Sequence, residues 1–263
     1  MSKTFGLALG SGGSRGIAHI GILVALEEAG IKPDYITGCS MGAVVGGCYA
    51  AGISAHEIRD IALRLKPRDI LDIGPSLLTR MSLLRSKKVE ELLGEYLGDT
   101  LIEDMSVGFR CVATDLISGK LHVFERGSAA LAVQASCAIP GVFRPVELDG
   151  MLLVDGGCLC RVPVKTVKDM GADVVVAVDV LSNVSQPIEK VGNVLSLMLR
   201  VFDLMDANQT DMRSRIEGDI ADIVLKPVID NVSQYAIKDL DNTYEVGYEL
   251  GKSYVDKIRA LIE

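Results

Sequence analysis

The chain has 263 residues, of which 49% are hydrophobic and 24% are charged, and its formal net charge is −8. A chain of this length can bury a sizeable core, and its acidic balance argues against a nucleic-acid-binding protein, which needs a basic face for phosphate groups. No apolar run approaches the roughly 20 residues that span a bilayer, and the apolar stretch near the N-terminus is too short and broken for a signal peptide.

The predicted strands are short apolar or alternating segments, at residues 5–9, 35–38, 109–114, 120–125, 146–148, 151–154, 173–180 and 223–225. The predicted helices repeat apolar residues with helical spacing, at residues 15–29, 43–51, 55–65, 87–97, 164–170, 189–215 and 240–261. Ser118-Gly119 and Asp149-Gly150 predict two hairpin turns. Because strands and helices alternate, we expect an α/β fold with a mostly parallel central sheet and helices on both faces.

No repeat, linker or low-complexity tract interrupts this order, so residues 1–263 are predicted to form a single domain. Segment 191–205 is apolar on more than one side. We interpret it as a buried helix. The alternative is a helix that meets a partner subunit of a homo-oligomer or a lipid surface.

The six cysteines include no CxxC pair. This usage favours reduced, mostly buried thiols of a cytoplasmic protein. Cys158 and Cys160 have no histidine nearby and make a poor metal site, so we expect no bound metal.

The segment Gly38-Cys39-Ser40-Met41-Gly42 has the spacing G-x-S-x-G between a predicted strand and a helix of small residues. This spacing is typical of a nucleophile elbow, in which a serine sits on a strained turn and the two glycines let backbones pass closely. The following helix would point N–H groups and its positive dipole end at an oxyanion formed there. Ser40 is therefore the candidate nucleophile of an acyl hydrolase or acyltransferase.

A serine nucleophile needs a base, which is usually a histidine. In α/β-hydrolases that histidine comes late in the chain, but no histidine follows His122 here. An early histidine would have to act as the base, and the candidates are His19, His56 and His122. Each of these is better explained as a structural or surface residue. The common triad is therefore not expected.

Asp155 is a second candidate base. It directly follows the predicted strand 151–154 and precedes Gly156 and Gly157. In parallel sheets the reacting groups gather at the carboxyl ends of the strands, and Ser40 also follows a strand. An ordinary turn aspartate is the alternative.

A third interpretation is a nucleotide-binding loop without catalysis. Gly10, Gly12 and Gly16 open a helix after a strand, and Asp34 lies about 20 residues further on, where a ribose-binding acid is expected. This interpretation leaves the G-x-S-x-G segment without a purpose.

Three motifs in this order resemble the patatin-like phospholipase family, in the form of its compact bacterial members: Gly12-Gly13-Ser14-Arg15-Gly16, the pentapeptide around Ser40, and Asp155-Gly156-Gly157. Residues 138–145 are similar to the family's Pro-x-x-Phe-x-Pro segment. Gly171-Ala172-Asp173 and the strand after it are similar to the strand that follows the aspartate in the family.

The resemblance implies a three-layer α/β/α fold and a Ser–Asp dyad without histidine, cofactor, metal or nucleotide. Ser40 would be the nucleophile and Asp155 the general base. Arg15 matches the family's loop arginine, which would either contact an oxyanion or lipid phosphate or brace the loop. The N–H groups of the oxyanion hole would come from Gly12, Gly13 and Ser14.

An ordinary aspartate has a pKa of about 3.9, far below that of a serine hydroxyl. Since the best general base has a pKa near the working pH, either burial raises the pKa of Asp155 or turnover is slow.

Two positions depart from the family's pattern. Ser11 stands at the first loop position, which is usually glycine. Cys160, followed by Arg161, stands where the family commonly has an asparagine after the aspartate. If that asparagine orders the wall of the active site, its replacement alters substrate choice but leaves the dyad in place.

Segment 66–88 is a candidate lid or membrane-contacting segment, with an ordinary loop and helix as the alternative. It carries six basic and two acidic residues, with leucines interleaved. Basic residues attract anionic head groups while leucines insert among the lipids.

These features together predict a cytoplasmic serine acyl hydrolase that also meets the inner membrane face peripherally. Its substrates would be lipid carboxylic esters, as for a phospholipase A, lysophospholipase or esterase, cleaved through an acyl-serine intermediate. The alternatives are acyl transfer on the same dyad and a regulatory protein that binds acyl chains without turnover.

Overall fold

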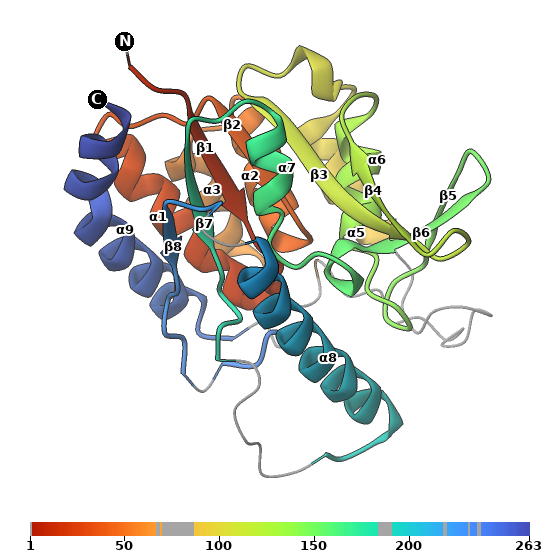
Figure 1. Ribbon diagram of the computed structural model, residues 1–263. Coiled ribbons are helices and arrows are strands. Elements are labelled where there is room, and N and C mark those ends of the chain that lie inside the picture. The colour runs from red at the N-terminus through yellow and green to blue at the C-terminus, as the bar shows by residue number, and fades with distance from the viewer. Residues whose placement is uncertain are drawn as a thin grey trace.

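The computed structural model describes residues 2–66, 69, 87–183, 191–217, 220–230, 232–235 and 238–263. Most of the candidate lid 66–88 lies outside these residues. The described strands form one central sheet in the order β5-β6-β3-β2-β1-β7-β8, with β4 paired to β3 (Figure 1). The strands are β1 (Phe5–Leu9), β2 (Tyr35–Gly38), β3 (Gly108–Asp115), β4 (Lys120–Phe124), β5 (Val146–Leu148), β6 (Met151–Asp155), β7 (Val174–Val178) and β8 (Ile223–Leu225).

Helices cover both faces of this sheet, which confirms the predicted α/β architecture. The described helices are α1 (Ile17–Glu28), α2 (Met41–Ala50), α3 (Ala55–Arg64), α5 (Lys87–Leu97), α6 (Ala129–Ser136), α7 (Val164–Asp169), α8 (Val194–Glu217) and α9 (Leu240–Ile262). Short 3₁₀ turns are η1 (Gly13–Gly16), η2 (Ile102–Asp104) and η3 (Gly156–Cys158).

The two faces of the sheet are covered unequally. The main apolar core lies between the sheet and a layer that includes α1, α2, α6 and α9. A small second core lies under α7, around Ala8, Val167 and Val175. The long helix α8 crosses near the carboxyl ends of the central strands, and its first turns extend away from the body of the molecule (Figure 1). No described residue of α8 belongs to either core.

The pairing in the sheet is parallel from β3 through β2, β1 and β7 to β8, and antiparallel where β4 and β6 join β3 and where β5 joins β6. Gly38 at the end of β2 is level with Cys111 of β3, so β3 continues past the end of β2 to Asp115. The carboxyl edge of the sheet therefore has a step, and β6 runs back along it.

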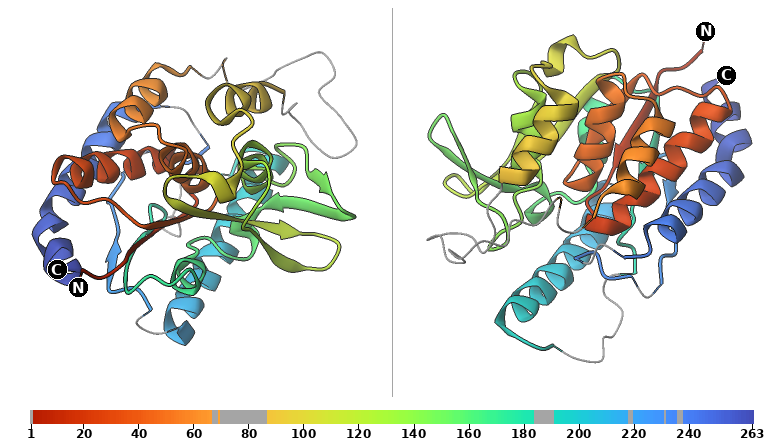
Figure 2. Two further views of the ribbon diagram at one scale, coloured as in Figure 1. Left: turned by 90° about the horizontal axis from the view of Figure 1, so that it is seen from above. Right: turned by 180° about the vertical axis from the view of Figure 1, so that it is seen from behind.

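Helices α1 and α9 lie side by side, as both views of Figure 2 show. Glycines let their backbones approach: a Cβ on Gly21 would lie 2.3 Å from the carbonyl oxygen of Tyr244, and a Cβ on Gly247 would lie 2.1 Å from that of Ala18. The rest of this interface is filled by buried apolar side chains such as Ile22 and Ile258.

We expect Gly247→Ala to lower the free energy of unfolding by roughly 1–3 kcal/mol, because the added methyl group must push two helix backbones apart. Urea unfolding followed by circular dichroism measures this. Gly94→Ala in α5 is the matched control, since its Cβ would meet nothing within 4 Å. In a helix that change should stabilise by about 0.5–1 kcal/mol. Equal stability of the two variants would contradict the close approach.

Candidate active site

Ser40 lies on the turn between β2 and α2, with φ 52° and ψ −121°. This is a sparsely populated conformation for a residue with a side chain, and such strain persists only where the surroundings enforce it. The flanking glycines leave no room for a Cβ: one on Gly38 would lie 2.4 Å from the Cα of Ala43, and one on Gly42 would lie 2.2 Å from the carbonyl oxygen of Leu9. The turn has the geometry that the G-x-S-x-G spacing predicts.

Ser136 at the end of α6 holds the elbow from the other side. Its hydroxyl accepts a hydrogen bond from the N–H of Ser40 at 2.9 Å and donates one to the carbonyl oxygen of Val112 at 2.7 Å. Helix α6 is absent from the predicted elements, because segment 129–136 is almost uniformly small and apolar. The only sequence signal for Ser136 is a hydroxyl in an otherwise buried run.

Asp155 ends β6, and its side chain lines the same small cavity as Ser40. The expected reason for this placement, a parallel strand ending at the carboxyl edge, is wrong. Strand β6 is antiparallel to β3, and Asp155 pairs with Ala113. It comes level with the elbow because β6 runs back along the part of β3 that extends beyond β2.

The carboxyl group of Asp155 is buried and well partnered. Its Oδ1 accepts a hydrogen bond from the N–H of Gly157 at 2.8 Å, and the thiol of Cys39 lies 3.8 Å away. Burial raises the pKa of Asp155 to about 6, although hydrogen bonds from Ser40, Gly157 and Cys39 lower it. Such a carboxylate is a stronger base than an exposed one, and it lines the same cavity as the candidate nucleophile.

The glycine loop runs along one wall of the cavity, which Gly12 and Gly13 line. Gly13 has φ +50°, and a Cβ there would lie 2.0 Å from the carbonyl oxygen of Gln234. Ser14 does not fit the role expected of it, because its N–H already donates to that carbonyl oxygen at 3.0 Å. Within the described part of the chain the N–H groups of Gly12 and Gly13 have no such acceptor.

Arg15 is not among the residues that line the cavity around Ser40. Its Nε donates to the carbonyl oxygen of Val232 at 2.8 Å, and another guanidinium nitrogen donates to the side chain of Asn183. Burial lowers the pKa of Arg15, and Asp203 and Asp230 raise it. Of the two expected roles, these contacts favour bracing of the loop.

None of the three histidines lines the cavity around Ser40. His19 is buried, its Nε2 lies 2.8 Å from the carbonyl oxygen of Gly10, and burial lowers its pKa to about 4. His56 lies 3.5 Å from Glu28 at the surface, and His122 contacts the ring of Phe124 edge-on. Their positions are those of structural and surface residues, as the sequence suggests.

The nucleotide interpretation fails on the position of Asp34. This residue precedes β2, at the amino edge of the sheet, and its Oδ2 accepts a hydrogen bond from the N–H of Phe5 at 2.7 Å. The glycine loop follows β1 at the opposite edge. A ribose held by Asp34 could not reach a phosphate held by that loop.

Helix α8 forms part of the wall of the cavity around Ser40. The sequence predicts this helix but not its position at the site. Phe202, Asp203 and Asp206 line the cavity. Asp203 accepts hydrogen bonds from the side chains of Gln234 and Tyr235, both at 2.6 Å, and burial raises its pKa. The sequence signal that could have placed α8 at the site is the pair Asp203 and Asp206, two carboxylates three residues apart in an apolar helix. The cavity measures about 30 Å³, which is room for about one water molecule.

Arg161 ties this wall to the sheet. Its buried guanidinium contacts Asp206 on α8 at 2.9 Å and Asp179 just after β7 at 3.0 Å. Its carbonyl oxygen accepts a hydrogen bond from the N–H of Ser11 in the glycine loop at 2.9 Å. Burial raises the pKa of Asp206 to about 6, and Arg161 lowers it. Arg161, the residue after the departing Cys160, thus joins three parts of the site.

All six cysteines are free thiols, and four of them are buried. Cys160 is one of the buried ones, and its thiol lies 3.6 Å from the carbonyl oxygen of Val162. Among the described residues, no three His, Cys, Asp or Glu side chains are grouped so that they could hold a metal ion.

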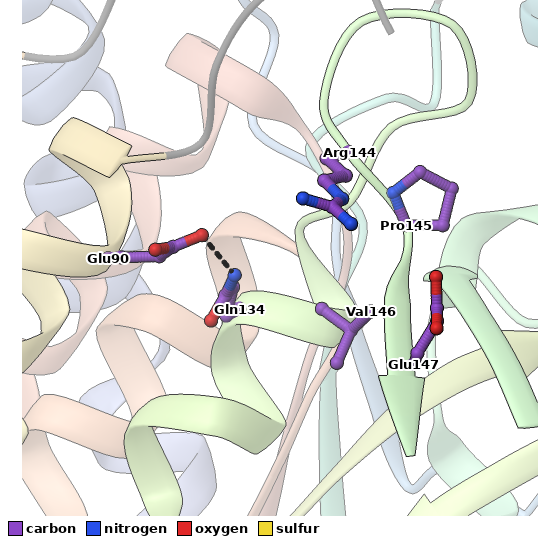
Figure 3. Close-up of a pocket in the computed structure, with 6 residues that line it drawn as sticks. All are labelled: Glu90, Gln134, Arg144, Pro145, Val146 and Glu147. Carbon is purple, nitrogen blue, oxygen red and sulfur yellow. Dashed lines mark hydrogen bonds between the residues drawn. The ribbon is translucent and has the colours of Figure 1, made fainter. Parts of the chain in front are cut away.

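A larger open cavity of about 230 Å³ lies between α5, α6 and β5 (Figure 3). Gln134 donates a hydrogen bond to Glu90 across it at 2.9 Å, and Arg144 and Glu147 also face it. Neither Ser40 nor Asp155 belongs to its lining, so it is not the candidate active site.

Comparison with known proteins identifies the family of this chain. Residues 7–168 match the family model of patatin-like phospholipases. An uncharacterized NTE family protein of Mycobacterium bovis is 41% identical over 186 residues, which are 71% of this chain and 51% of that protein. A lysophospholipase of Emericella nidulans, nte1, is 30% identical over 285 residues, which cover 98% of this chain and 18% of that protein. The chain spans about half the length of the first relative and about a fifth of the second.

The crystal structure of VipD from Legionella pneumophila has the same fold. Its TM-score is 0.59, and the match covers 97% of this chain and 67% of that chain at 16% sequence identity. At this identity the likeness concerns the fold alone.

We expect Asp155→Asn to stabilise the fold at pH 8 by on the order of 2 kcal/mol, because it removes a buried negative charge. The raised pKa means that the folded wild type loses its proton near pH 6 but the unfolded chain near pH 4. Wild-type stability therefore falls as the pH rises through this window, and the advantage of the variant should vanish below about pH 4.

Urea unfolding at a series of pH values tests this. Asp149→Asn, at the exposed turn between β5 and β6, removes the same formal charge and should not reproduce the gain. A pH-independent difference between Asp155→Asn and wild type would contradict the buried-charge explanation.

We expect Arg161→Met to cost roughly 3–5 kcal/mol of unfolding free energy, because it leaves two buried carboxylates without a counter-charge. Arg110→Met is the control: its partner Glu125 is 53% exposed, and the loss should stay below about 1 kcal/mol. Adding Asp206→Asn to Arg161→Met should restore part of the loss. If the added Asp206→Asn restores none of the lost unfolding free energy, uncompensated buried charge is not the cause of the loss.

Proposed function

The chain belongs to the patatin-like phospholipase family, and on that premise we propose that it is a serine hydrolase of lipid carboxylic esters. The single observation that carries the proposal is that a strained Ser40, at the N-terminus of α2, lines one small cavity together with the buried carboxyl of Asp155. The fungal relative, named a lysophospholipase, supports a lipid ester as substrate.

In the proposed reaction the Oγ of Ser40 forms a bond to the ester carbonyl carbon while its proton passes to Asp155. The negative charge moves to the carbonyl oxygen, where the N–H groups of Gly12 and Gly13 and the N-terminus of α2 would stabilise it. When the carbon–oxygen bond breaks, the leaving alcohol takes the proton from Asp155.

Water then attacks the acyl-serine. It gives a proton to Asp155, and collapse of the intermediate returns that proton to Ser40 and releases the fatty acid. Asp155 suits both half-reactions because a base works best when its pKa is near the working pH, and burial brings that of Asp155 to about 6.

Acyl transfer to another alcohol or thiol would use the same dyad and is the second candidate. The cavity around Ser40 admits a water molecule, the acceptor that hydrolysis needs, so hydrolysis is the first candidate. A binding protein without turnover has no comparable support, because a strained serine paired with a buried carboxylate costs stability and is not needed for binding.

We also propose that the protein works in a reducing compartment, as its six free thiols suggest, and meets its substrate as a peripheral membrane protein. Among the described helices, none has both the length and the apolar character needed to cross a bilayer.

A fluorophosphonate probe tests the proposal. We expect one covalent adduct, located by mass spectrometry on Ser40 and absent in Ser40→Ala. Asp155→Asn should lower turnover of a short-chain p-nitrophenyl ester by at least about 100-fold, since a general base contributes that much or more. Asp149→Asn is the control and should hydrolyse this ester like wild type. Full activity of Asp155→Asn would refute the dyad, and an unlabelled wild type would refute the nucleophile.

A further inference from the structure

Helix α8 is apolar on the side that faces solvent. Among the α8 residues whose exposure the structure describes, seven large apolar side chains are exposed: Val194, Leu197, Met198, Val201, Leu204, Met205 and Met212. Three of them are exposed by more than 60% of their surface, namely Val194 at 73%, Met198 at 63% and Met205 at 67%. Their spacing of three, four and seven residues places them on one side of the helix. We call this surface the outer stripe of α8.

The opposite side of the same helix faces the active site. Asp203 and Asp206 are 8% and 6% exposed and line the cavity together with Phe202. This is the reverse of an ordinary surface helix, which turns its apolar side inward and its charges to solvent. Since no described residue of α8 belongs to an apolar core, polar contacts from Arg161, Gln234 and Tyr235 hold its inner side instead.

The geometry points to a lipid surface as the partner of the outer stripe: we infer that α8 inserts these side chains into the head-group region of a bilayer and so seats the active site against it. This inference rests on the proposed function, because a site for lipid esters needs access to the phase that holds them. The helix that would contact the lipid is the helix that lines the cavity around Ser40.

A second copy of the chain fits the outer stripe less well. A stable protein interface takes about 20–30 residues from each partner. The outer stripe offers seven side chains on a single helix whose first turns extend away from the body of the molecule (Figure 1). Such a narrow, convex surface suits insertion among lipid head groups, where each side chain is covered from several directions.

Charge indicates which lipid surface is favoured. The chain carries a net charge of −8, and the outer stripe itself contains no charged residue. Attraction to anionic head groups is therefore not the source of binding. Burial of apolar side chains drives the binding instead, so the partner is a neutral or zwitterionic lipid surface. Such binding persists at high salt, because it does not depend on attraction between charges.

Flotation with phosphatidylcholine vesicles tests this inference. The assay uses the 263-residue chain with the Ser40→Ala substitution, so that binding is measured without turnover. We expect binding that persists in about 1 M NaCl, where charges are screened within about 3 Å. Adding M198Q, V201Q and M205Q should weaken it by at least about tenfold, because three apolar side chains no longer favour insertion.

The matched control is the pair L101Q and V224Q, which replaces two other exposed apolar side chains, 40% and 46% exposed, away from α8. This variant should bind vesicles like its parent. Thermal unfolding followed by circular dichroism verifies that both sets of changes leave the protein folded, since all the altered side chains are exposed.

Three results would overturn the inference: no binding to phosphatidylcholine vesicles, binding abolished by salt, or equal weakening by the control pair. A concentration-dependent dimer in analytical ultracentrifugation that the triple change abolishes, without vesicle binding, would assign the outer stripe to a second copy instead. Because vesicle binding is measured without turnover, failure of the proposed hydrolysis and failure of this surface are separate results.

Discussion

The strained backbone at Ser40 is the constraint on which the rest of the site depends. A non-glycine residue at φ 52° and ψ −121° costs on the order of 1–3 kcal/mol, and it persists only if its neighbours leave no alternative. Gly42 brings α2 against the carbonyl oxygen of Leu9, and Ser136 holds the N–H of Ser40. These contacts fix the turn from the sheet side and from α6. The hydroxyl of Ser40 therefore lies at the N-terminus of α2, in the cavity that Asp155 and the glycine loop also line.

The wall opposite the elbow is held by a different kind of interaction. Helix α8 contributes no described residue to the apolar cores, so its position depends on polar contacts: the ion pair of Asp206 with Arg161, which also pairs with Asp179, and the hydrogen bonds from Gln234 and Tyr235 to Asp203. Buried ion pairs add little net stability, since desolvation offsets their attraction, but they are directional. Arg161 thus fixes the position of α8 through its side chain. The same residue also fixes the glycine loop, because its carbonyl oxygen accepts a hydrogen bond from the N–H of Ser11.

The parts of the molecule that could be predicted are those whose cause is local. Turn residues and apolar periodicity predict β1, β2, both hairpins and α5 with ends within a residue or two of those observed, because their signals lie inside each segment. Helix α6 escaped prediction because its residues are small and apolar on all sides, and the fold alone decides which of them face the elbow.

Long-range contacts account for the errors at the site. The antiparallel return of β6 follows from how far β3 extends beyond β2, which no local pattern in either strand encodes. Ser14 lost its expected role to a carbonyl oxygen more than 200 residues later in the chain, at Gln234. Asp203 and Asp206 are visible in the sequence as two carboxylates within an apolar helix. Their place in the site depends on residues from distant elements, namely Arg161, Gln234 and Tyr235, which the sequence pattern does not reveal.

The environment of Asp155 bears on its proposed role, because the residue types alone leave open whether an aspartate has a high enough pKa to serve as the base for a serine. The same burial that raises its pKa to about 6 makes its charged form costly at neutral pH. The hydrogen bonds from Ser40, Gly157 and Cys39 limit that cost without cancelling it. In the proposed reaction, Asp155 serves as the base because the fold around it holds its carboxylate in an unfavourable charged state. Stability is lost at the same carboxyl group where basicity is gained, and a substitution that neutralises the group should reverse both effects together.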